Sequence, residues 1–129
     1  MQNTAIDKVL DNVNDGNVHV LFVSPEKICS GFFGRRLRTI SQPLGFVCVD
    51  EVHCASEWSH NFRPSYLRLG DTLRSIFDRP VVLGLSATLT AGSQADVVRV
   101  FQFSEIERGA LLRKNLLWRV EKTEPGQDK

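Results

Sequence analysis

The chain has 129 residues, 42% of them apolar and 24% charged, and its formal net charge at pH 7 is +1. These values are typical of one ordinary globular domain, and the near-neutral charge means that any binding of nucleic acid must come from a local patch. No apolar run approaches the roughly 20 residues of a membrane span, and the amino terminus lacks the basic-then-apolar pattern of a secretory signal, so we expect an intracellular protein without a membrane segment.

The first part of the chain predicts a helix, a strand and a second helix. Apolar residues at i, i+3, i+4 and i+7 indicate an amphipathic helix over residues 4–14. Residues 18–23 (VHVLFV) form a short apolar run that is typical of a buried strand. Ser24 as N-cap and Pro25 at the first helical position then begin a helix that we expect over residues 25–40.

The second part of the chain continues this alternation. Residues 44–50 predict a second strand, and Pro64 begins a helix that should end near Phe77. Residues 81–86 predict a third strand. A capping box formed by Ser93 and the acidic residue three positions later predicts a last helix that ends at about residue 102.

Strands that are apolar throughout and alternate with helices indicate an α/β fold. We expect strands 18–23, 44–50 and 81–86 to form a parallel sheet, with 44–50 in the centre, flanked by helices in a three-layer arrangement. Residues 1–115 form the predicted domain. Residues 116–129 are predicted to be an exit segment followed by a disordered tail, because the last nine residues include five charged ones. Residues 116–120 are alternatively a short strand.

All three predicted strands end in small polar or acidic residues. These are Ser24-Pro25-Glu26, Asp50-Glu51 and Ser86-Ala87-Thr88. The carboxyl ends of parallel neighbouring strands meet at one edge of a sheet, which is where such sheets bind ligands. We therefore expect the three segments to lie close together.

The adjacent carboxylates of Asp50 and Glu51 suit phosphate hydrolysis. Asp50, at the strand terminus, can hold Mg²⁺ directly or through a water molecule. Glu51 can polarise the water that attacks a γ-phosphate, and His53 on the following turn can hydrogen-bond the phosphate. The alternative is a pair of solvated acids at the end of a strand.

An aromatic and basic segment follows the two acids. It contains Trp58, His60, Phe62 and Arg63 and has no regular period. Aromatic faces stack on bases and arginine contacts phosphates, so this segment is suited to single-stranded nucleic acid. The alternative is a loop in which Trp58 and Phe62 pack into the core.

The run from Asp50 to Arg68 (DEVHCASEWSHNFRPSYLR) closely resembles motif II and the aromatic-rich loop of RecQ-type DNA helicases. Ser59 and Asn61 are more similar to the Rothmund–Thomson branch of that family than to its bacterial members. Ser24-Pro25-Glu26 resembles motif Ib of the family, and Ser86-Ala87-Thr88 resembles its motif III. Arg113, Asn115 and Leu116 resemble the exit into the second helicase lobe.

This resemblance implies an ATP-dependent 3′–5′ DNA helicase of superfamily 2 that acts in DNA unwinding, recombination and repair. It implies a RecA-like (P-loop NTPase) fold, ATP and Mg²⁺ as cofactors, and single-stranded or forked DNA as partner, in the nucleus of a eukaryote or the cytoplasm of a bacterium. By this resemblance Asp50 binds Mg²⁺ and Glu51 is the catalytic base. The residues implied to couple hydrolysis to movement are His53, Ser86, Ala87 and Thr88, and those implied to contact DNA are Trp58, Phe62 and Arg63, with Ser24, Pro25 and Glu26 of motif Ib.

Two residues depart from the family pattern. Val52 stands where the family has alanine, which is tolerated if its side chain faces the helix layer. Glu57 stands where the family has glutamine. Its negative charge should weaken phosphate binding unless Arg63 or Arg68 neutralises it.

The sequence contains no G-x-x-x-x-G-K-[ST] pattern, so it supplies no backbone cradle and no lysine for the β- and γ-phosphates. We therefore expect part of a first helicase lobe without its phosphate-loop strand. Activity then requires the upstream phosphate-loop segment and the second lobe. In such folds the missing strand pairs with the motif III strand, so the outer edge of residues 81–86 should be unpaired, which predicts marginal stability or self-association.

Two other functions stay open. One is a catalytically inactive nucleic-acid-binding fragment that retains the aromatic-rich loop, which Glu57 and the missing phosphate loop favour. The other is a metal hydrolase that uses Asp50, Glu51, His53 and His60. The absence of HExxH spacing argues against it.

Overall fold

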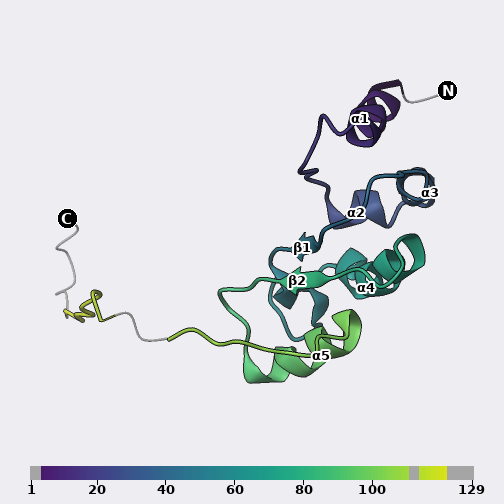
Figure 1. The fold of residues 1–129 in the computed structure, drawn as a ribbon. Coiled ribbons are helices and arrows are strands. Elements are labelled where there is room, and N and C mark those ends of the chain that lie inside the picture. Colours follow the sequence, from purple (N-terminus) through teal and green to yellow (C-terminus); the bar gives the residue numbers. More distant parts are fainter. Residues whose placement is uncertain (1–3, 111–113, 122–129) are drawn as a thin grey trace, which may run out of the picture.

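The computed structural model describes residues 4–110 and 114–121. Five α-helices, one 3-10 helix and two strands follow one another along this part of the chain (Figure 1). Their order is α1 (Thr4–Asn14), α2 (Pro25–Ile28), α3 (Gly31–Leu37), β1 (Val47–Val49), η1 (Val52–Ala55), α4 (Pro64–Ile76), β2 (Val82–Gly84) and α5 (Ala91–Phe101). No helix among these residues combines the length and the apolarity needed to cross a membrane.

The two strands form a parallel sheet, as predicted for 44–50 and 81–86, although each strand is shorter than expected. Val47 lies opposite Val82, and Val49 lies opposite Gly84. Parallel strands need a crossover connection, and η1 and α4 provide it here. The α/β class is therefore confirmed.

The prediction of a strand at residues 18–23 is wrong. This segment runs between α1 and α2 outside any sheet, and the side chains of Val20 and Phe22 are 69% and 93% exposed. An apolar run becomes a strand only where a neighbour completes its hydrogen-bond ladder, and the described part of the chain places no strand beside it. The sheet consequently has two strands instead of three, and β1 lies at an edge instead of in the centre.

Helices cover one face of this small sheet. Val47, Val49 and Val82 face the core that α4 and α5 build with η1. The opposite face carries Cys48 and Leu83, which are exposed. Within the described residues the molecule therefore has two layers, and the third layer of the predicted arrangement is not present.

Helices α4 and α5 approach each other closely at Gly70. A Cβ atom at this position would lie 2.0 Å from the backbone oxygen of Val100. Glycine at position 70 is therefore required by the packing of the two helices that support η1.

The predicted helix over residues 25–40 is interrupted. The first short helix ends at its C-cap Cys29, and Ser30 is the N-cap of the second. The Ser30 hydroxyl connects the two helices, because it donates to the Lys27 carbonyl and accepts from the Phe33 N–H group. The separate helix α3 packs through Phe33 and Leu37 against Leu10 of α1, the helix predicted over residues 4–14.

The carboxyl-terminal part of the chain also differs from the prediction in detail. Thr90 is the N-cap of α5 and accepts the Ser93 N–H group, so the helix begins before the predicted capping box. Residues 116–120 form no strand, which leaves the exit-segment alternative. The predicted disordered tail and Arg113 lie outside the described residues, apart from the start of the tail at Glu121.

Candidate functional site

The carboxyl ends of β1 and β2 lie side by side and position the two acids next to the Ser86 turn. Backbone hydrogen bonds continue beyond the strands, from the Leu85 N–H group to the Val49 carbonyl (2.9 Å) and from the Val52 N–H group to the Leu85 carbonyl (3.0 Å). The sheet therefore brings together two of the three strand-end segments that the sequence predicted to meet.

The chain turns sharply at the acids. Glu51 has a left-handed backbone (φ 52°), which is uncommon for a residue with a side chain and directs the chain out of β1 into η1. Asp50 lies exposed before it, and its Oδ1 atom accepts the Glu51 N–H group at 2.9 Å. The Tyr66 hydroxyl donates to the Asp50 carbonyl at 3.1 Å, which ties this turn to α4.

His53 connects Glu51 to the Ser86 turn. Its imidazole is buried, with 5% of the residue exposed, and its Nδ1 atom lies 3.1 Å from Glu51 Oε2 and 2.9 Å from Ser86 Oγ. Ser86 Oγ also accepts the Thr88 N–H group at 3.4 Å, while the side chains of Ala87 and Thr88 are exposed. His53 Nε2 has no hydrogen-bond partner among the described residues. The imidazole is thus a bridge between an acid and the turn that follows β2.

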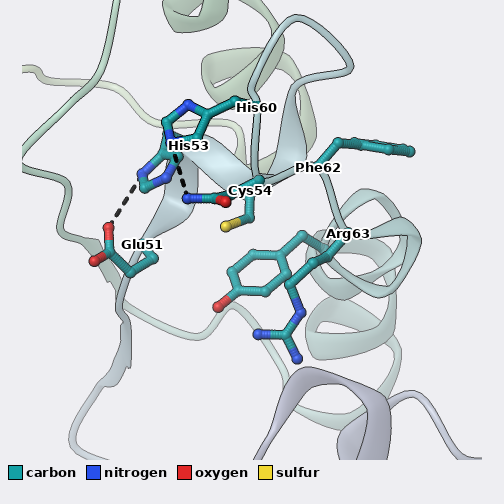
Figure 2. A pocket seen from close by; sticks show the side chains of 8 residues that line it. Glu51, His53, Cys54, His60, Phe62 and Arg63 are labelled. Carbon is teal, nitrogen blue, oxygen red and sulfur yellow. Dashed lines mark hydrogen bonds and ion pairs between the residues drawn. The ribbon is translucent and has the colours of Figure 1, made fainter.

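The aromatic segment projects from the end of η1. Trp58 is 84% exposed and Phe62 is half-buried, so the alternative in which both rings pack into the core does not hold. Figure 2 shows the Phe62 ring pointing away from the imidazoles of His53 and His60. Those two imidazoles stack with their centroids 6.3 Å apart.

A cavity of about 510 Å³ lies between the acids and the aromatic segment (Figure 2). The residues lining it are Glu51, His53, Cys54, His60, Asn61, Phe62, Arg63 and Tyr66. Burial raises the pKa of the Cys54 thiol, so this wall of the cavity stays uncharged at neutral pH. One open space therefore borders both the acid Glu51 and the residues suited to nucleic acid.

Glu26 reaches the far end of the aromatic segment from α2. Its Oε1 atom accepts hydrogen bonds of 2.6 Å from both Ser65 Oγ and Arg63 Nη2. The hydrogen bond from Ser65, a backbone hydrogen bond and the hydrogen bond from Arg63 lower the pKa of Glu26 to about 2. The Arg63 guanidinium also lies over the Tyr66 ring, 5.3 Å from its centroid.

The motif Ib segment thus joins the site although residues 18–23 form no strand. Ser24 and Pro25 have a local structural role, and their contact with nucleic acid stays a prediction. Ser24 Oγ accepts the Lys27 N–H group, and Pro25 occupies the first position of α2. In the structure these two residues begin the helix that carries Glu26.

The two departures from the family pattern have different surroundings. Val52 is buried in the core beside α4 and α5. Its side chain therefore faces the helix layer, which is the condition for tolerating valine in place of alanine. Glu57 is exposed and forms no ion pair with any described residue, and Arg63 pairs with Glu26.

Sequence reasoning missed the residues that support the site from other elements. Ser65 and Tyr66 stand in the recognised run, but their partners Glu26 and Asp50 could not be inferred from local spacing. Asp96, expected in a capping box, instead accepts a hydrogen bond from Ser56 at 2.8 Å.

The side chains at the site suit Mg²⁺ bound at Asp50 better than they suit the metal site of a metal hydrolase. Within the described ranges no three His, Cys, Asp or Glu side chains gather in a way that could hold a metal, so the metal-hydrolase alternative lacks a ligand set. An exposed carboxylate at a strand end, such as that of Asp50, does suit Mg²⁺, which keeps most of its water ligands and takes one or two carboxylates.

Comparison with known proteins agrees with this geometry. The family model of DEAD/DEAH box helicases matches residues 1–97. The chain is 44% identical over 97 residues to the ATP-dependent DNA helicase Q4 of Mus musculus, covering 72% of this chain and 8% of the relative. It is 33% identical over 124 residues to the ATP-dependent DNA helicase RecQ of Bacillus subtilis, covering 95% of this chain and 21% of the relative.

The chain therefore spans a small part of the length of these relatives. Helicase Q4 represents the Rothmund–Thomson branch, in agreement with the resemblance at Ser59 and Asn61. The family match and the relatives confirm the predicted resemblance, and the chain belongs to the DEAD/DEAH box helicase family, within its RecQ-type members.

Proposed function

We propose that this chain is the part of a RecA-like first lobe that carries motif Ib, motif II, the aromatic-rich loop and motif III of an ATP-dependent 3′–5′ DNA helicase. The parent enzyme binds single-stranded or forked DNA and unwinds duplex DNA in recombination and repair. It acts in the nucleus of a eukaryote or in the cytoplasm of a bacterium, and uses ATP and Mg²⁺. The names of the relatives, which are ATP-dependent DNA helicases, support this proposal.

One observation carries the proposal. A continuous set of contacts runs from Glu51 through His53 to Ser86, and the cavity beside it is also lined by Phe62 and Arg63 of the aromatic segment. A motor needs such proximity, because hydrolysis must change the grip on the strand. Trp58 of the same segment is 84% exposed, which leaves its indole free to stack on a base.

The proposed roles at the acids follow from their surroundings. Asp50 holds Mg²⁺, which, when bound with ATP, neutralises charge that develops on the transferred phosphoryl group. Glu51 Oε2 is held by His53, and Glu51 Oε1 has no hydrogen-bond partner among the described residues, so it is available to accept a proton from the attacking water.

His53 transmits the state of Glu51 to the second strand end. Because its Nδ1 atom contacts both Glu51 Oε2 and Ser86 Oγ, a movement of the carboxylate changes the hydrogen bond to the Ser86–Thr88 turn. We propose that this turn and His53 form the coupling element, with His60 stacked on the imidazole as its link to the aromatic segment.

Binding of ATP by this chain alone is not supported. The sequence offers no phosphate-loop pattern for the β- and γ-phosphates. We propose that hydrolysis requires the upstream phosphate-loop segment and the second lobe, and that the isolated chain retains only nucleic-acid binding.

Binding of single-stranded DNA by the isolated chain tests the proposal. We expect salt-dependent binding that falls about tenfold or more when Trp58 and Phe62 are both changed to alanine, because base stacking contributes about 1–3 kcal/mol per base. Fluorescence anisotropy of a labelled oligonucleotide measures this.

The matched control is Trp118→Ala, which removes an equally exposed indole outside the site. It should leave the affinity unchanged. Equal loss in the control and in the double variant, or no binding by the unaltered chain, contradicts the proposal.

A nucleic-acid-binding module without catalysis is the second candidate. The missing phosphate-loop pattern and the exposed Trp58 favour it for the chain as it stands. DNA binding by the chain, with no DNA-stimulated ATPase after the upstream segment and second lobe are joined to it, would select this candidate over the motor.

A further inference from the structure

Ser56 lies where the buried 3-10 helix η1 passes into the exposed aromatic segment. Ser56 is 0% exposed, which is unusual for serine, and its hydroxyl both donates and accepts a hydrogen bond. The hydroxyl donates to Asp96 Oδ2 at 2.8 Å and accepts the Trp58 N–H group at 3.3 Å. One buried oxygen therefore connects the backbone of Trp58 to a carboxylate on another helix.

Asp96 belongs to α5, the helix that follows the Ser86–Thr88 turn. Thr90 caps this helix two residues after the turn ends. Asp96 Oδ1 is bound by Arg99 of the same helix at 2.9 Å, which leaves Oδ2 for Ser56. The hydrogen bond from Ser56 and then that from Arg99 lower the pKa of Asp96, so the carboxylate is ionised at neutral pH and the bond from Ser56 is charge-assisted.

The exposed part of the aromatic segment, residues 57–62, is thus held at both ends by carboxylates of neighbouring helices. At one end Asp96 of α5 binds Ser56, and at the other end Glu26 of α2 binds Arg63. The pair at Ser56 is buried on the serine side, whereas both members of the other pair are about half exposed. Burial makes the Ser56 connection the more rigid of the two.

We propose that Ser56 and Asp96 are positioning residues, which set the direction of Trp58 for stacking on nucleic acid and connect it to the helix after the Ser86–Thr88 turn. This inference rests on the proposed function, because it concerns how the aromatic-rich loop is held. It adds a connection from the loop to the helix that follows motif III, separate from the contact between His53 and Ser86 of motif III.

Loss of the connection releases the Trp58 backbone from η1. The indole then samples many directions in the free chain, and that freedom is lost when it stacks on a base. We expect Ser56→Ala to weaken binding of single-stranded DNA by about tenfold, the effect of one hydrogen bond to a charged group.

Asp96→Ala breaks the connection on the helix side: the Trp58 N–H group keeps its bond to Ser56 Oγ, but the Ser56 hydroxyl is no longer fixed to α5. Asp96 is partly exposed on a helix, and alanine is the best helix former, so this variant folds even if Ser56→Ala does not. It should weaken DNA binding to a similar extent.

Two matched controls separate positioning from general damage. Ser59→Ala removes a hydroxyl of the same loop that accepts only the Asn61 N–H group within that loop. Arg99→Ala removes the other partner of Asp96 and leaves the bond from Ser56 in place. Both controls should change the DNA affinity by less than about twofold.

The test uses the isolated chain in a Trp118→Phe background, so that Trp58 is the only tryptophan. Oligonucleotide binding gives the affinity, acrylamide quenching reports the mobility of the Trp58 indole, and thermal unfolding by circular dichroism reports the fold. In the longer helicase, the DNA concentration for half-maximal ATPase stimulation should rise about tenfold, with a change of less than about twofold in the rate at saturating DNA.

The two proposals fail in different ways. If the unaltered chain does not bind DNA, the proposed function fails and this inference fails with it. The same holds if the Trp58→Ala variant binds DNA as tightly as the unaltered chain. If Trp58→Ala loses binding but folded Asp96→Ala and Ser56→Ala bind like the Ser59→Ala control, only the positioning roles are overturned.

Discussion

The two halves of the segment after the acids differ in burial and in the contacts that hold them. Residues 52–56 are buried, and all of them are held by α4, α5 or η1 itself. Residues 57–62 are exposed or half-buried and are bonded mainly within the segment. The buried base fixes where the segment begins, and the exposed tip presents Trp58 to a ligand. Changes beneath the base should therefore affect stability first, whereas changes at the tip should affect binding first.

Gly70→Ala beneath the base should have the largest effect on stability. A Cβ atom there would lie 2.0 Å from the Val100 carbonyl oxygen, so α4 and α5 must separate. We expect a loss of about 2–4 kcal/mol in the free energy of unfolding, measured by urea denaturation.

Gly92→Ala is the matched control. It lies in α5, and a Cβ atom there has no neighbour within 4 Å, so the variant should be neutral or slightly stabilising. Equal stability of the two variants would show that the close helix contact does not support the base.

The sequence predicted most of what is local and little of what connects distant segments. The strands at 44–50 and 81–86 and the helix at Pro64 follow from apolar runs and a helix-start residue. Residues 18–23 carry the same apolar pattern but lack a neighbouring strand, which local composition does not reveal.

The same division holds at the site. Glu51, His53 and Trp58 were identified from their order along the chain. The pairs Glu26–Arg63 and Ser56–Asp96 join residues 37 and 40 positions apart, and neither pair has a local pattern. Only the packing of α2 and α5 against η1 and α4 brings them together.

Glu26→Gln tests the ion pair between Glu26 and Arg63 at the end of the exposed tip. The change removes the charge that neutralises Arg63, and the freed guanidinium can bind phosphate. We expect the affinity for single-stranded DNA to rise about threefold with a steeper dependence on salt, measured by anisotropy at several salt concentrations. A lower affinity would show that Glu26 presents Arg63 to DNA instead of withholding it.

The pH dependence of this pair follows from the pKa of Glu26, which is lowered from 4.5 to about 2. The pair therefore stabilises the folded chain fully above the pKa of the unfolded state, and this stabilisation is lost as the pH falls from about 4.5 towards 2. Carboxyl NMR of Glu26 should show ionisation persisting at pH 3. Titration near pH 4.5 would contradict the pairing.

Leu83→Gln should have the smallest effect on binding and tests whether exposure alone creates a binding surface. Leu83 is 49% exposed on the uncovered face of the sheet and does not line the cavity beside the aromatic segment. We expect reduced self-association in sedimentation velocity, because an exposed apolar sheet face promotes association, with unchanged DNA affinity. A monodisperse unaltered chain would contradict this prediction.

The most direct test of the account is DNA-stimulated ATP hydrolysis by a helicase that contains this chain with its phosphate-loop segment and second lobe. With Glu51→Gln, we expect the stimulated rate to fall about a hundredfold or more, the usual effect of removing a general base, while single-stranded DNA still binds. Glu57→Gln, which changes a nearby exposed acid outside the cavity lining, should retain the rate. Undiminished hydrolysis in Glu51→Gln would contradict the assignment of catalysis to the acid that His53 holds.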